Sequence, residues 1–213
     1  MISFKKSLLL LSLWAAAGVA AATPFSLTGV SFAPGVGYGV DGTETSDLST
    51  LLDVRFTTTG FSAQNFNLNT VGQSKTFAIG TVQLAESNNA QGITQNERDF
   101  LDVKVTFSFL LPGNTSPFVT ANGAAEAGSV QDNELDYVLT WSPMTVNFGT
   151  SGKYQISLAN LSFDGKNNTA LQTQNATITL LAADNAVPEP GSIALFGLGM
   201  LALGGLRRRQ RAA

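Results

Sequence analysis

Strict alternation of apolar and polar residues is the feature that most constrains how this chain can fold. In residues 101–109 every odd position is Leu, Val or Phe and every even position is polar. A period of two places the apolar side chains on one face of a β-strand, which packs against a core. The pattern recurs in residues 52–56 and 176–180. The alternation therefore predicts β-strands that each have one buried face.

Other apolar runs add strands and indicate where the chain bends. Further strands are predicted at residues 25–32, 76–84, 136–141, 144–148 and 153–163. The apolar phase slips at Gly80, at Ser142-Pro143 and after Leu158. A slip turns the apolar side chains to the opposite face, so it predicts a bulge or a strand that passes to a second sheet.

The body of the chain shows no amphipathic helical periodicity, and turn residues fill the gaps between the predicted strands. About eight strands separated by such turns are typical of an all-β domain with antiparallel pairing. We expect a single antiparallel β-sandwich or jelly-roll-like domain over residues 23–186.

Composition excludes several classes of function. The chain has no Cys and no His, which excludes disulfides, thiolate metal sites and a Ser-His-Asp triad. Between residues 23 and 186 there are 6 basic and 14 acidic residues, a net charge of −8. Binding to nucleic acid requires a basic patch, so we expect no nucleic-acid partner.

The N-terminal 22 residues have the composition of a secretory signal peptide. Lys5 and Lys6 form a positive start, an apolar run follows from Leu8 to Ala17, and small residues close the segment. This order is typical of a segment that signal peptidase removes. We expect cleavage before Thr23 and export of the body.

The C-terminal segment, residues 187–213, has three parts. Val187, Pro188, Glu189 and Pro190 come first, and an apolar run, residues 193–206, follows. The basic end contains Arg207, Arg208, Arg209 and Arg211. The 14 apolar residues would span about 21 Å as a helix, short of the ~30 Å hydrocarbon core.

We predict a short transmembrane helix at about residues 192–206, with the arginines as a membrane stop. The positive-inside rule keeps those arginines cytoplasmic, so the body lies across the inner membrane. A plain permanent anchor is the alternative interpretation of this segment.

Three features follow one another in this tail: Pro188-Glu189-Pro190, a short Gly-rich apolar run and a basic end. Their order resembles the PEP-CTERM sorting signal of Gram-negative bacteria. The resemblance implies that an exosortase, a membrane peptidase, cuts near the motif. The inner membrane would then be a transient anchor, and the protein would pass to the cell surface or to an extracellular exopolysaccharide matrix.

Parts of the body resemble the choice-of-anchor cores that often carry this tail. The similar stretches are residues 76–111, 136–140 and 152–163. One such group has a Thr-His-x-Asn signature, and the corresponding residues here are Ala85-Glu86-Ser87-Asn88, without the histidine.

Acidic clusters are the candidate binding sites of the body. Asp132, Glu134 and Asp136 occupy positions 1, 3 and 5 of an EF-hand-like start, but Tyr137 replaces the required Gly and Pro143 the required Glu. The EF-hand interpretation therefore fails. A surface calcium site remains one hypothesis, and a solvated acidic loop is the other; we expect no other metal and no cofactor.

Aromatic residues give a weak signal for carbohydrate binding. Trp141 is in phase with Tyr137 and Leu139, so we expect it in the core, and Tyr38 in a Gly-rich loop is the best candidate for an exposed ring. The spelling G-x-G-x-x-G at residues 37–42 precedes an acidic, non-helical segment, which indicates a loop and not a dinucleotide site.

Three hypotheses for function follow. The first is an exported structural or interaction protein of the surface or extracellular matrix, without catalysis. The second is a carbohydrate- or calcium-binding module of the cell envelope. The third is a hydrolase with two carboxylates, which a deep acidic cleft with one strongly raised carboxylate pKa would favour.

Overall fold

The structure is a computed structural model that describes residues 22–41, 50–86, 92–130, 132–164 and 171–184, together with Gly197. The described strands are β1 (Thr23–Pro34), β2 (Val54–Thr57), β3 (Gln64–Leu68), β4 (Ser74–Leu84), β5 (Asp102–Leu111), β6 (Phe118–Ala125), β7 (Leu135–Ser142), β8 (Met144–Phe148), β9 (Gly152–Leu158), β10 (Leu161–Asp164) and β11 (Leu171–Ala182). One short 3₁₀ helix, η1 (Gln95–Glu97), precedes β5.

The predicted signal helix and the predicted transmembrane helix lie outside the described residues, apart from Ala22 and Gly197. Within the described part of the chain, no helix is both long enough and apolar enough to cross a bilayer.

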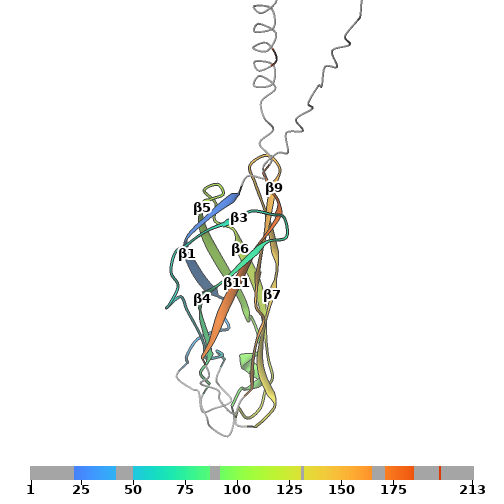
Figure 1. The fold of residues 1–213 in the computed structure, drawn as a ribbon. Helices are drawn as coiled ribbons and strands as arrows, with labels where there is room; N and C mark the ends of the chain where they lie inside the picture. Colours follow the sequence, from blue (N-terminus) through green and yellow to red (C-terminus); the bar gives the residue numbers. More distant parts are fainter. Residues whose placement is uncertain are drawn as a thin grey trace, which may run out of the picture.

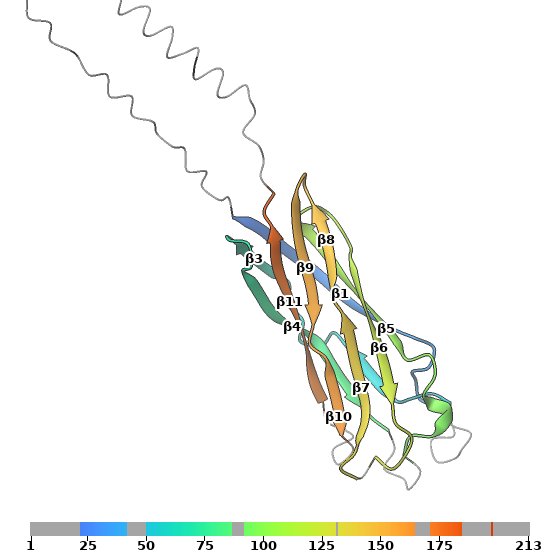
Figure 2. The same cartoon turned by 90° about the vertical axis from the view of Figure 1, so that its right-hand side faces the viewer.

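The strands form two antiparallel sheets (Figures 1 and 2). The six-stranded sheet has the order β10-β7-β6-β5-β1-β3, and the five-stranded sheet has the order β2-β4-β11-β9-β8. Every pairing between neighbouring strands is antiparallel. The expected all-β class is confirmed.

The alternating apolar residues of both sheets meet in one core. On β5, Val103, Val105, Phe107 and Phe109 are all buried, as the alternation predicts. Aromatic rings from the two sheets also pack together: the rings of Phe25 and Tyr154 meet edge to face with centroids 5.3 Å apart. Edge-to-face pairs of this kind contribute about 0.5–1.5 kcal/mol beyond the area that they bury.

The predicted phase slips are confirmed as bends. β7 and β8 belong to different sheets and are separated by Pro143, and β9 and β10 also change sheets, across residues 159–160. At Gly80 the register of β4 against β11 shifts by a bulge. Gly80 has φ 155°, and a Cβ there would lie 2.0 Å from the carbonyl oxygen of Thr57, so only glycine fits.

A buried polar network fixes the chain where it crosses between the sheets. The Gln174 side chain, on β11, is fully buried and accepts a hydrogen bond from Trp141 Nε1 at 3.0 Å. Its Nε2 donates to the Ala159 carbonyl at 2.8 Å, and Asn160 Oδ1 accepts from the Trp141 backbone N–H at 2.9 Å. Trp141 is in the core, 6% exposed, as predicted.

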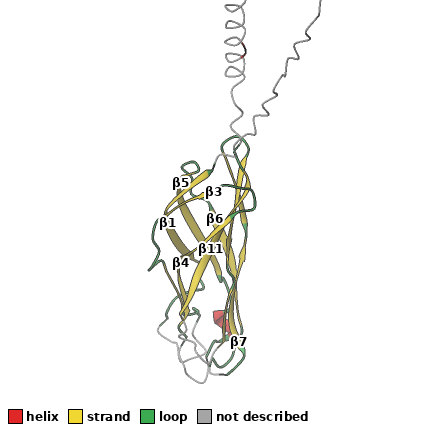
Figure 3. Ribbon diagram, in the orientation of Figure 1, coloured by secondary structure: helices red, strands yellow, loops and turns green. Residues whose placement is uncertain are grey.

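The two ends of the sandwich differ. The terminal end holds the start of β1 at Thr23 and the end of β11 at Ala182, and the two lie at the same end of the sheets in Figures 1 and 2. The loop end holds the described residues that connect β1 to β2, β4 to β5 and β6 to β7. Figure 3 shows η1 at the loop end, in red.

We predict that Gln174→Ala lowers the free energy of unfolding by about 2–4 kcal/mol, because it leaves the buried Trp141 N–H and the Ala159 carbonyl without partners. Denaturant unfolding of the full chain in mild detergent, followed by far-UV circular dichroism, measures the loss. Gln172→Ala is the matched control, since Gln172 on the same strand makes its hydrogen bond to the Ser162 carbonyl at the surface. Equal losses for the two variants would contradict the role given to the network.

Candidate functional site at the loop end

The predicted sorting residues Val187, Pro188, Glu189 and Pro190, and the stop residues Arg207, Arg208, Arg209 and Arg211, lie outside the described residues. The described body continues to Asp184, whose carboxylate accepts the backbone N–H groups of Thr150 at 3.0 Å and Ser151 at 3.1 Å. These hydrogen bonds fix the end of the described body at Asp184, three residues before the predicted motif starts.

Negative charge concentrates at the loop end. All described carboxylates except Asp184 lie in its loops or on the adjoining strand ends. They are Asp41, Asp53, Glu86, Glu97, Asp99, Asp102, Glu126, Asp132, Glu134, Asp136 and Asp164. The described basic residues nearby are Arg55, Arg98 and Lys104, so this end is strongly negative.

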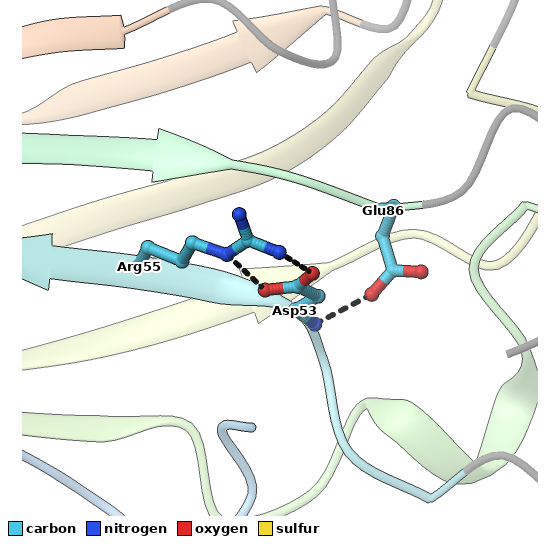
Figure 4. Close-up of polar contacts among 3 residues, drawn as sticks. All are labelled: Asp53, Arg55 and Glu86. Carbon is cyan, nitrogen blue, oxygen red and sulfur yellow. Dashed lines mark hydrogen bonds and ion pairs between the residues drawn. The ribbon is translucent and has the colours of Figure 1, made fainter. Parts of the chain in front are cut away.

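Asp53, Arg55 and Glu86 form a polar cluster where β2 begins and β4 ends (Figure 4). Arg55 holds the Asp53 carboxylate with two hydrogen bonds, Nε to Oδ1 at 3.1 Å and Nη2 to Oδ2 at 2.8 Å. Glu86 Oε1 accepts the Asp53 backbone N–H at 2.6 Å, and the Asp53 carbonyl accepts the Ala85 N–H. Asp53 and Glu86 are 5% and 2% exposed.

These contacts link the start of β2 to the end of β4. Two parallel hydrogen bonds from a guanidinium to a carboxylate are the strong form of an ion pair. A carboxylate that accepts a backbone N–H compensates for part of its own burial. The alternation in residues 52–56 correctly places Asp53 between the apolar positions of the strand. It does not predict that the Asp53 side chain is buried.

Glu97 is a third buried carboxylate with a structural contact. Its side chain accepts the backbone N–H of Thr94 and completes a capping box at η1. Glu97, Asp99 and Asp102 are close in sequence, but Glu97 is 1% exposed whereas Asp99 and Asp102 are exposed. These three acidic residues are therefore divided between the interior and the surface.

The predicted calcium ligands also have different environments. Asp132 Oδ1 accepts the Glu134 backbone N–H at 2.8 Å, and both residues are exposed. Asp136 is 4% exposed, and its Oδ2 has no hydrogen-bond partner among the described residues. In the part of the chain that the structure describes, no three His, Cys, Asp or Glu side chains are placed to hold a metal ion.

Burial raises the pKa of Asp136 from its ordinary value of 3.8 to about 6. The negative charges of Asp132, Asp164 and Glu134 raise the pKa further. Both effects disfavour the ionised carboxylate in the folded protein.

Tyr38 is not the exposed ring that its Gly-rich loop suggested. Its hydroxyl donates to the Leu101 carbonyl at 2.9 Å and accepts from the Tyr137 hydroxyl at 2.7 Å. Its ring packs edge to face on Phe56 and on Tyr137. The exposed aromatic ring of the loop end is Phe100, 71% exposed, which alternation alone could not distinguish from the core phenylalanines.

Comparison with known protein families finds a match in the tail. The family described as the PEP-CTERM protein-sorting motif matches residues 186–209. The tail is a PEP-CTERM sorting motif. No curated protein and no solved structure matches the chain.

The PEP-CTERM motif indicates export and sorting that depends on an exosortase, with a transient membrane anchor. The matched residues include the predicted Pro188, Glu189 and Pro190 and the first three arginines of the membrane stop. The similarity of the body to choice-of-anchor cores stays a prediction, and Ser87 and Asn88 of that comparison lie outside the described residues.

We predict that Asp136→Asn stabilises the fold near neutral pH and has little effect near pH 4. Because the folded pKa of Asp136, about 6, exceeds the ordinary 3.8, the wild-type free energy of unfolding should fall as pH rises from about 4 to about 6. The variant lacks this fall and should be about 1–3 kcal/mol more stable at pH 7. Urea unfolding across this pH range measures the difference.

Asp99→Asn is the charge control for this prediction. It removes one negative charge from the loop end at an exposed position, so its stability should stay close to wild type at both pH values. A pH-independent difference between Asp136→Asn and wild type would contradict the assignment.

Proposed function

We propose that the body is a non-catalytic structural or interaction domain that an exosortase releases from its tail at the cell surface. It then acts in the extracellular matrix, associated with exopolysaccharide. The PEP-CTERM motif at residues 186–209 is the observation that carries this proposal.

The arrangement of the body supports release without refolding. β11, the last strand, is paired on both sides, with β4 and with β9, and ends at Ala182. The buried apolar residues of the described body lie between Phe25 and Leu180. A cut near residues 188–190 therefore removes nothing from this core.

The absence of catalysis is part of the proposal and rests on what three of the four buried carboxylates of the described residues do; the fourth is Asp136. Asp53 is held by Arg55, while Glu86 and Glu97 each accept a backbone N–H. These are structural contacts that fix loops, and the chain has no histidine to act as a general base beside them.

Carbohydrate binding is the second candidate function. A polar depression at the loop end, next to the exposed Phe100 in the chain, favours it. The domain would then bind its matrix directly.

We predict that Pro188→Ala combined with Glu189→Ala leaves the body folded but retained in the membrane fraction. The double variant removes the extended segment that the exosortase is expected to bind, so the basic tail stays attached. Intact mass spectrometry of the protein from the surface, the medium and the membranes of its native host is the measurement. Wild-type protein should lack residues 1–22 and most of 191–213, whereas the variant should keep the arginines.

Pro34→Ala combined with Glu134→Ala is the matched control, since it changes one exposed proline and one exposed glutamate of the body. The control should be processed as wild type. Normal processing and release of the motif variant would refute the sorting proposal.

A further inference from the structure

Phe100 has an unusual backbone conformation for an exposed aromatic residue. It lies between η1 and β5 with φ 59°, the one described residue other than glycine with a positive φ. The left-handed region costs a residue with a Cβ about 1–2 kcal/mol. Its side chain is nevertheless 71% exposed, so burial of the ring does not offset this strain. Strain that packing does not explain is often found at binding sites.

The surrounding backbone holds Phe100 in this conformation. Gly37 N–H donates to the Phe100 carbonyl at 3.3 Å, and Gly35 N–H donates to the Asp102 carbonyl at 2.7 Å. A Cβ at Gly35 would lie 2.6 Å from the Phe100 carbonyl oxygen, and one at Gly37 would lie 2.1 Å from that of Asp99. On the other side, Gly123 N–H donates to the Leu101 carbonyl at 2.6 Å. The ring is therefore presented to solvent from a fixed backbone.

Asp99, the residue before Phe100, is one of the residues that line a polar depression. The volume of the depression is about 350 Å³, and it is lined by Gln95, Arg98, Asp99 and Glu126 together with residues 123–125. This volume is in the range of small-molecule sites. The lining offers acceptors from two carboxylates and an amide, and donors from the amide and the guanidinium.

The guanidinium of Arg98 is already used to shape this depression. Its Nε donates to the Ala125 carbonyl at 2.8 Å, and its Nη1 donates to Gln95 Oε1 at 3.0 Å. Its Nη2 lies 3.6 Å from Glu126 Oε2. Among the described residues, no hydrogen bond or ion pair to the Asp99 carboxylate is found.

The negative charge of the loop end favours cationic ligands over anionic ones. An anionic ligand, such as a chain of uronic acids, would meet the carboxylates of Asp99, Asp102 and Glu126. A ligand with a protonated amine gains from the same field and from a cation–π contact with the Phe100 ring. A sugar ring also presents an apolar C–H face that can pack on an exposed aromatic ring.

We infer that the depression between residues 95–99 and 123–126 binds an amino-sugar unit of a polysaccharide. The Phe100 ring packs on the sugar face, and Asp99 and Glu126 receive the ammonium and hydroxyl groups. This inference rests on the proposed function, because it gives the matrix-associated domain its point of attachment.

The probe is a tetramer of glucosamine, tested by isothermal titration calorimetry on the full chain in mild detergent. The pH is mildly acidic, so that the amines of the probe are protonated. We expect the tetramer to bind about tenfold more tightly than its N-acetylated counterpart and more tightly still than a uronic-acid tetramer.

Phe100→Gly separates binding from folding. Glycine adopts a positive φ without the steric penalty, so the melting temperature should equal or exceed that of wild type. The same variant loses the ring and should bind the glucosamine tetramer about tenfold more weakly. Phe118→Ala, at an exposed phenylalanine at the start of β6, is the matched control and should bind as wild type.

Asp99→Asn tests the charge. It keeps the shape of the side chain and should weaken binding of the glucosamine tetramer several-fold, with little effect on the N-acetylated tetramer.

Lack of binding by wild type, unchanged affinity in both variants, or preference for the uronic-acid tetramer would overturn the inference. If the glucosamine tetramer does not bind but the protein is released normally from the membrane, the proposed function still stands. If the protein instead keeps its tail, only the proposed function is refuted.

Discussion

The hydrogen bonds of Gln174 are the interaction on which the arrangement of the two sheets depends. The chain has no cysteine, so no disulfide joins the sheets. Besides its longer connections, the chain passes directly from one sheet to the other where β7 continues into β8 and where β9 continues into β10. Gln174 reaches both crossings from β11, through the Trp141 indole and the Ala159 carbonyl. A polar group fully satisfied inside an apolar core favours a single packing arrangement, because alternatives would leave it unpaired.

The acidity of the body is partly a product of how its loops are stabilised. Carboxylates accept backbone N–H groups in several connections: Asp41 from Thr50 and Leu51, Asp132 from Glu134, and Asp184 from Thr150 and Ser151. Such acceptors stabilise loops in a protein without disulfides. Because most connections with carboxylates lie at the loop end, the same residues also give that end its negative field.

The sequence predicted the all-β class, most strands and the three bends, because burial on one face imposes a period of two. It missed β6 because its buried positions include Ala121 and Ala125, which give little apolar contrast, and β3 because it is a short edge strand. It predicted the sorting motif, whose signal is local. It did not predict the burial of Glu86 or the exposure of Phe100, since both depend on how distant loops meet.

The placement of β11 has a mechanical consequence. A load applied through the C-terminus pulls along the axis of a strand paired on both sides, over nine residue pairs with β4 and six with β9. The hydrogen bonds that pair β11 with β4 and with β9 are then loaded together, in shear. They resist the pulling force in parallel and do not break one at a time. If the loop end is attached to a polymer while the tail is still in the membrane, the domain works as a tension-bearing link. Once the tail is cut the tension disappears, and the folded domain remains on the polymer.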